Sequence, residues 1–132
     1  MEIVKKAPTV KGPAEWFTGD VYLDVLFRGE DPARARLASV HFTPCARTAW
    51  HRHSLGQALH VTEGLGLVVN RDGQVIILRP GETVWTPPGE EHWHGAAPDA
   101  FMTHLALWEG DDVTWLDHVA DTEYLSAATH LA

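Results

Sequence analysis

The chain has 132 residues, of which 45% are hydrophobic and 21% charged, so it can bury one core but is too short to divide comfortably into two domains. Its formal net charge of -8 argues against a nucleic-acid partner, and no stretch is apolar enough for a membrane span or a secretory signal. We therefore expect one cytoplasmic domain, residues 1–132. With a single cysteine, any metal site must rest on histidine and oxygen ligands.

Short β-rich runs separated by turn residues predict an all-β domain. In chain order the expected strands are residues 21–27, 35–43, 48–53, 57–63, 65–70, 74–79, 83–86, 91–97 and 100–108. Such even spacing favours a double-sheet jelly roll or a small barrel.

Two local signals refine this prediction. The Asp72-Gly73 pair is typical of a tight hairpin whose two central residues both have positive φ, and it should join residues 65–70 antiparallel to 74–79. The tail, residues 121–130, is expected to form one short helix with Asp121 as its N-cap.

Histidines at the period of a strand are the main chemical signal. His51 and His53 are two residues apart, so on a strand both imidazoles project from one face and can converge on one ion. Gln57 follows after a short glycine-containing gap, which turns its amide oxygen toward the same point. His92 and His94 repeat the two-residue spacing directly after a Pro-Pro-Gly turn.

The first of these segments, residues 48–64, resembles the first motif of the cupin superfamily. It reads His51-x-His53-x-x-x-Gln57, followed by Gly64, with glutamine where the family usually has glutamate. The resemblance includes the position of Gly64 as well as those of the two histidines.

The second segment, residues 81–97, is similar to the second cupin motif from Gly81 to His92, and Ala96 stands where the family has its last asparagine. Together the two motifs imply a cupin fold, that is, a double-stranded β-helix or jelly-roll barrel. They also imply that His51, His53, Gln57 and His92 bind one divalent transition metal ion.

The glutamine leaves this ion unusually positive. Three neutral imidazoles and a neutral amide cancel none of its double charge, so the site should favour an anionic guest. The nitrogen and oxygen donors suit manganese, iron, cobalt, nickel or zinc. Manganese is the metal that the closer resemblance described below implies.

The strand expected at residues 100–108 should contribute a wall of the pocket. Alternation places Met102, His104, Ala106 and Trp108 on one face, and His104 is the ionisable group among them. A nearby dication should lower its pKa, which would keep it neutral and available as a base. The alternative is a core histidine bonded to a neighbouring carbonyl. His94, two residues beyond a proposed ligand, is a further candidate for contact with substrate.

The remaining histidines and tryptophans lack such a setting. We expect these histidines at the surface: His41, His60, His118 and His130. We expect these tryptophans in the core or at an interface: Trp16, Trp50, Trp85, Trp93 and Trp115.

Residues 11–14, 16–19, 46–51, 92–98 and 102–106 are also similar to bacterial single-domain cupins that include manganese-dependent hydroxynitrile lyases, which carry the same glutamine, and this similarity covers nearly the whole chain. This resemblance implies cleavage of a cyanohydrin to an aldehyde and cyanide, or the reverse, with the metal as Lewis acid and His104 as base. Thr48 would orient the substrate oxygen, and Ala38 and Val40 would form part of the pocket wall. Trp108 departs from the smaller polar residue of those lyases and should narrow the pocket.

Two other functions fit the same motifs. A non-haem oxygenase would use the open positions of the metal for dioxygen and substrate. A non-enzymatic cupin would bind a small ligand without turnover. In each case the partner is a small molecule, and we expect a homodimer or homotetramer assembled through edge strands.

Overall fold

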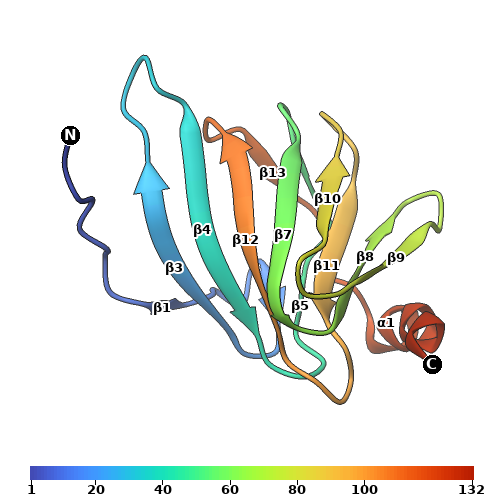
Figure 1. The fold of residues 1–132 in the computed structure, drawn as a ribbon. Coiled ribbons are helices and arrows are strands. Elements are labelled where there is room, and N and C mark those ends of the chain that lie inside the picture. Colours follow the sequence, from blue (N-terminus) through green and yellow to red (C-terminus); the bar gives the residue numbers. More distant parts are fainter.

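The computed structural model describes residues 1–132 and consists mainly of antiparallel strands in two curved sheets (Figure 1). The first sheet has the order β1 (Val10–Lys11), β3 (Val21–Arg28), β4 (Ala35–Phe42), β12 (Met102–Glu109), β7 (Gln57–Gly64) and β10 (Thr83–Thr86). The second has the order β13 (Val113–Trp115), β6 (His51–His53), β11 (His92–Ala96), β5 (Arg47–Thr48) and β2 (Phe17–Thr18). It also includes β8 (Gly66–Asn70), which pairs with β11, and β9 (Val75–Leu78), which pairs with β8.

From β4 onward the chain crosses repeatedly between the two sheets. After β5 and β6 it returns to the first sheet as β7, crosses to β8 and β9, returns as β10, and then supplies β11, β12 and β13 alternately. This winding is the double-stranded β-helix that the sequence predicted, so the all-β fold class with a short carboxyl-terminal helix is confirmed.

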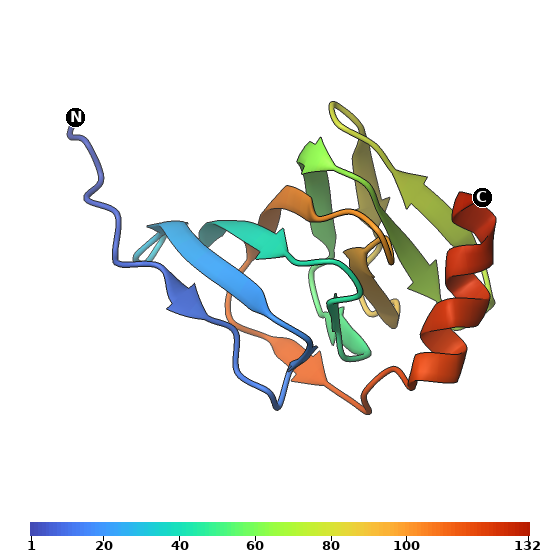
Figure 2. The ribbon, with the colours of Figure 1, turned by 90° about the horizontal axis from the view of Figure 1, so that it is seen from below.

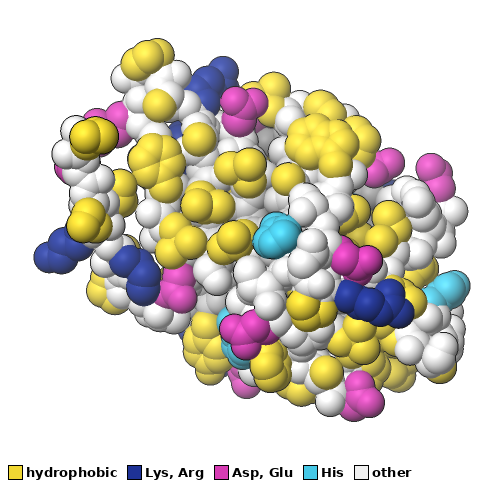
Figure 3. Space-filling model, viewed as in Figure 1, with side chains coloured by type: hydrophobic (Ala, Val, Ile, Leu, Met, Phe, Trp, Pro, Cys, Tyr) yellow, Lys and Arg dark blue, Asp and Glu magenta, His cyan; other side chains and the backbone are white.

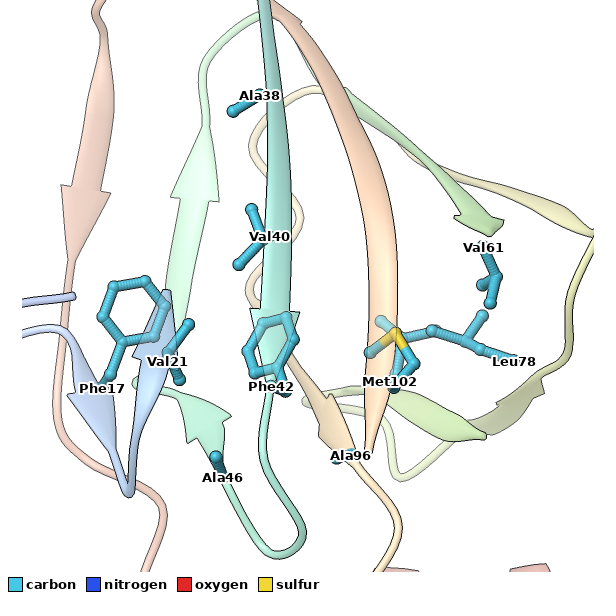
Figure 4. Close-up of a cluster of buried hydrophobic side chains, with 11 residues drawn as sticks. Phe17, Val21, Ala38, Val40, Phe42, Ala46, Val61, Leu78, Ala96 and Met102 are labelled. Atoms are coloured by element: carbon cyan, nitrogen blue, oxygen red, sulfur yellow. The ribbon is translucent and has the colours of Figure 1, made fainter. Parts of the chain in front are cut away.

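Successive side chains of a strand point to opposite faces of the sheet, and the apolar ones face the space between the two sheets. In β4, for example, Ala38, Val40 and Phe42 are buried while their neighbours are only partly so. They belong to a core of eleven buried side chains (Figure 4). The two sheets therefore enclose an apolar interior along most of their length, which fixes the strands that carry the histidines.

A second, smaller core lies outside the sandwich. It packs Trp50, Leu67 and Trp93 against Tyr124 and Ala127 of the helix α1 (Asp121–Ala128), which a 3-10 turn, η1 (Thr129–Leu131), extends. Figure 2 shows this helix lying along the side of the β8 and β9 hairpin. No helix of the structure is both long and apolar enough to cross a membrane.

The strand expected at residues 48–53 is interrupted. Ala49 and Trp50 lie between β5 and β6 and bond elsewhere: the Ala49 amide donates to the Trp16 carbonyl (2.7 Å) and the Trp50 amide to the Asp117 carbonyl (2.9 Å). Trp50 faces outward into the second core, on the face opposite that of His51.

The hairpin at residues 70–74 has the expected pairing but a different turn. Only Gly73 has positive φ (83°), whereas Asp72 does not, and the Gly73 amide donates to the Asn70 carbonyl (3.1 Å). The Asn70 side-chain oxygen also accepts from the Gln74 amide (2.9 Å). The asparagine thus closes a three-residue loop in place of the two-residue turn that we predicted.

The predicted N-cap is also wrong. Ala120 occupies that position with no side-chain cap, and Asp121 is the first residue of α1. The Asp121 carboxylate instead accepts from the Arg47 guanidinium (2.7 Å), whose side chain is only 4% exposed. An unpaired buried charge destabilises the folded state by roughly several kcal/mol, which is more than a missing helix cap costs. Asp121 therefore pairs with Arg47 and does not cap the helix.

Candidate metal centre

Two neighbouring strands bring four buried imidazoles together. His51 and His53 lie on β6, His92 and His94 lie on β11, and His51 is the direct cross-strand partner of His92. The ring centroids of His51 and His92 are 4.3 Å apart, and those of His51 and His94 are 5.2 Å apart. All four side chains are buried. The two-residue spacing predicted this shared inward face.

Two of these rings are braced by the main chain. The Nδ1 of His51 donates to the Ala49 carbonyl at 3.0 Å, and the Nδ1 of His92 donates to the Glu90 carbonyl at 3.0 Å. A proton on Nδ1 leaves the Nε2 lone pair free in each ring. This is the tautomer and orientation that metal-binding histidines adopt.

Gln57 reaches the same point from the opposite sheet. Its Oε1 lies 3.1 Å from the Nε2 of His92, and its side chain is buried. Two ligand atoms each about 2.1 Å from one ion, at right angles, are about 3.0 Å apart. The separation between the glutamine oxygen and the histidine nitrogen therefore fits two ligands of one ion.

His94 lies closer to this group than the sequence suggested. The ligand atoms of His51, His92 and His94 all lie within 4.8 Å of one another. The His53 ring is 5.4 Å from that of His51 and 6.2 Å from that of His92, measured between centroids. Both His53 Nδ1 and His94 Nε2 are buried without a hydrogen-bond partner. A cluster of buried, unsatisfied nitrogen lone pairs is what a bound divalent cation would satisfy, so the residues fit a metal.

His104 lies behind His94 and contacts it directly. Its Nε2 is 3.0 Å from the Nδ1 of His94, so one ring donates to the other. Phe42 packs against both rings, at 5.7 Å from His94 and 5.3 Å from His104 between centroids. The even-numbered face of β12 points inward, as predicted, and His104 is bonded to a histidine and not to the carbonyl of the alternative interpretation.

Burial keeps these histidines neutral. Loss of solvation lowers the pKa of His104 to about 4, and loss of solvation together with the charge of His92 lowers the pKa of His53 to about 4. Burial, followed by the charges of neighbouring histidines, holds the pKa values of His51 and His94 well below the usual range. Neutral rings have the free nitrogen lone pairs that metal binding requires.

The other residues predicted to line a pocket lie on strands next to this group. Ala38 and Val40 are buried and lie opposite Ala106 and His104 in the sheet. The Thr48 hydroxyl accepts from the His94 amide (3.2 Å), so it positions β11 as well as facing the interior. The half-buried Trp108 ring lies 5.9 Å from the His53 ring.

Met102 is fully buried in the apolar core (Figure 4). The expected surface histidines do not join the cluster: His41 and His60 bond to threonines of neighbouring strands, while His118 and His130 are exposed.

Three neighbours of the site were not foreseen from the sequence. Trp115, on the short strand β13, stacks on the His51 ring at 4.5 Å between centroids. Asn70 is the cross-strand partner of His92, and Thr86 is that of Gln57. No spacing signal could reveal these neighbours, because they depend on which strands pair and in which register.

Comparison with known proteins identifies the family. The model of the cupin domain family matches residues 38–108, more than half of the chain. The chain belongs to the cupin family. A cupin-like protein from Thermotoga maritima superimposes on this cupin with a TM-score of 0.85 and 36% identity, covering 96% of this chain and 97% of that one. A polyketide cyclase, RemF from Streptomyces resistomycificus, shares the fold with a TM-score of 0.65 and 24% identity, covering 84% and 83% of the two chains.

A closer sequence relative is a protein of Granulicella tundricola named (R)-mandelonitrile lyase. It is 55% identical to this cupin over 117 residues, which is 86% of this chain and 89% of the relative.

The metal-free cupin should be sensitive to acid. The pKa of His104 is about 4 in the folded chain and about 6.5 when unfolded, so stability is fully present above about pH 6.5 and falls as the pH drops toward 4. Between pH 7 and pH 5 this one ring should contribute about 2 kcal/mol to the loss of folding stability. Urea unfolding of chelator-treated protein between about pH 7 and pH 5 measures it. A midpoint independent of pH over this range would contradict the neutral burial of the cluster.

Proposed function

We propose that this cupin is a metal-dependent lyase that cleaves cyanohydrins to an aldehyde and cyanide, and joins them in reverse. The observation that carries the proposal is the neutral His94 and His104 pair, hydrogen-bonded at 3.0 Å and placed directly beside the cluster of metal-ligand atoms. The 55% identity to a protein named (R)-mandelonitrile lyase supports this reaction over other cupin activities.

The residues that would hold the ion are His51, His53, Gln57 and His92, with manganese as the proposed metal. An ion held there would supply Lewis acidity to the substrate hydroxyl or carbonyl oxygen. His53 is proposed as the third imidazole ligand because it is the second histidine of the first cupin motif and its Nδ1 is buried without a hydrogen-bond partner. The cluster is buried, so the imidazole pair stays neutral with a lone pair to offer, and little water is present to compete for the proton of the substrate.

His104 and His94 would move the proton. The substrate hydroxyl loses its proton to the imidazole pair, the bond between the carbinol carbon and the nitrile carbon breaks, and the electron pair leaves with cyanide. The proton then passes to cyanide, so hydrogen cyanide and aldehyde leave together. Thr48 would orient the substrate oxygen, and Ala38, Val40 and Trp108 would bound the side chain of the substrate.

The direct test is anaerobic turnover of mandelonitrile by the manganese-loaded protein, followed by release of benzaldehyde. We expect turnover without oxygen. Absence of turnover, with substrate-dependent oxygen uptake by an iron-loaded sample, would favour the oxygenase instead. Tight binding of the cyanohydrin without any product would favour a non-enzymatic cupin.

We also propose that the chain assembles as a homodimer or homotetramer. Figure 3 shows hydrophobic side chains gathered on the outer face of the six-stranded sheet. Among them, Trp85 and Leu107 are 57% and 49% exposed. A second copy of the chain that covers this patch would remove apolar surface from water, which stabilises the assembly by about 25 cal/mol for each Å² buried.

A charge in that face should separate the subunits. We expect Leu107→Glu to lower the molar mass measured by light scattering to that of one chain, while Leu125→Glu, at an exposed position of α1, leaves it unchanged. A wild-type protein that is monomeric at all concentrations would contradict the assembly.

A further inference from the structure

The sandwich is open along one side. β9 pairs only with β8 and β10 pairs only with β7, so no strand pairing joins β9 to β10 although they are consecutive in the chain. Figure 1 shows the β8 and β9 hairpin diverging from β10 on this side. We call the opening between these two edges the β9–β10 seam. A cavity of about 240 Å³ lies in it, lined by Val68, Asn70, Gln74, Ile76, Val84, Trp85, Thr86, Pro87, Glu90 and His92.

The seam cavity reaches the proposed metal ligands from behind. His92 is its most buried polar wall residue, at 1% exposure. Asn70 lies opposite His92 in the β8 and β11 ladder, and Thr86 lies opposite Gln57 in the β10 and β7 ladder. Cross-strand partners share a face of the sheet, so these two polar side chains flank the two ligands. The inner end of the cavity is therefore next to His92 and Gln57.

The chemistry of the cavity suits a hydrated cation. Its polar residues include Asn70, Gln74, Thr86 and Glu90, all of which carry oxygen, and no lysine or arginine lines it. A divalent ion with six waters occupies roughly 180 Å³, taking about 30 Å³ for each water, which is less than the cavity holds. On the opposite side of the cluster, Phe42 packs on His94 and His104, and Trp108 lies against His53. That side is lined by aromatic rings that pack on the histidines.

We propose that the β9–β10 seam is the route by which the divalent metal ion reaches and leaves the centre. The inference rests on the proposed metal-binding function. The seam residues contact the ion only while it moves in or out. They therefore affect the activation free energy for metal uptake and release, and not the free energy of the bound ion. A change that narrows the seam should therefore slow loading and release by the same factor and leave the dissociation constant unchanged.

Ile76 is the position to vary. It is 38% exposed, its partner Val68 is buried, and both line the cavity. We expect Ile76→Trp to slow both the uptake of Mn²⁺ by the metal-free protein and its release to excess EDTA about tenfold, a barrier increase of about 1.4 kcal/mol. We expect Ile76→Ala to accelerate both. Val84→Phe, across the seam, narrows it independently if the tryptophan variant does not fold.

The matched controls are Leu125→Trp and Leu125→Ala, which make the same kinds of change at an exposed aliphatic residue of α1, away from the seam. They should leave both rates unaltered. Rates that are equal in the wild type and in all Ile76 and Val84 variants would overturn the route while leaving the metal centre intact. A changed dissociation constant with an unchanged uptake rate would also overturn it. A wild-type protein that takes up no Mn²⁺ would overturn the metal centre itself, and this proposal with it.

Discussion

His92→Ala is expected to lose nearly all of its metal. His92 is braced by the Glu90 carbonyl, and its Nε2 lies 3.1 Å from the Gln57 oxygen, so its loss removes the ligand that links the two sheets. Loss of a residue that only supports a ligand typically costs about 10–100-fold in affinity, so loss of the ligand itself should cost at least about 100-fold. Elemental analysis after dialysis, with Mn²⁺ titration by calorimetry, measures both stoichiometry and affinity.

The control is His60→Ala, which removes a histidine on the outer face of the first sheet, where its Nδ1 bonds to Thr83. It should retain stoichiometric metal. Full retention by His92→Ala would refute the ligand assignment. The same assay separates His53 from His94: we expect His53→Ala to bind metal weakly and His94→Ala to retain it. The opposite result would make His94 the ligand, as its place among the three closest imidazoles allows.

His104→Ala is expected to lose turnover but keep its metal. Its Nε2 contacts His94 and not Gln57, so the ligand atoms stay in place while the pair loses its proton acceptor. Removal of a general base typically costs about 100- to 10,000-fold in rate. The measurement is benzaldehyde release from mandelonitrile by the Mn²⁺-loaded variant, with metal content determined on the same sample.

A second variant tests whether the loss of turnover in His104→Ala comes only from disturbed packing. His104→Gln keeps polarity and much of the volume in the buried site but has no basic nitrogen, so it should fold and still be slow. His41→Ala, across the sheet from Thr103 on the outer face, is the matched control and should remain fully active. A turnover rate in His104→Gln within a few-fold of the wild type would exclude His104 as the base.

The sequence predicted the parts of this molecule that depend on local periodicity. His51 and His53, like His92 and His94, share a face because side chains alternate along a strand, and nothing distant can alter that. The same holds for His104 on β12. The prediction of the second sheet was poorer at residues 48–53, where the amides of Ala49 and Trp50 bond to the distant carbonyls of Trp16 and Asp117 and the strand is interrupted.

The contacts between side chains of different strands could not be predicted from the sequence. Trp115 stacks on His51 only because β13 pairs with β6, and this strand of three half-buried residues shows no alternation of burial. The bond between His94 and His104 likewise joins opposite sheets. Such neighbours are fixed by sheet order and register, which are properties of the whole fold.

The way in which His51 and His92 are braced bears on how this site tolerates mutation. Each imidazole donates to a main-chain carbonyl two residues earlier in the chain, at Ala49 and Glu90. A carbonyl is present whatever side chain stands at that position. The orientation of both rings is therefore set by the path of the backbone and not by the side chains at residues 49 and 90. Substitution of the half-buried Glu90 should therefore leave the orientation of His92 unchanged, whereas the completely buried Ala49 can tolerate little increase in side-chain size.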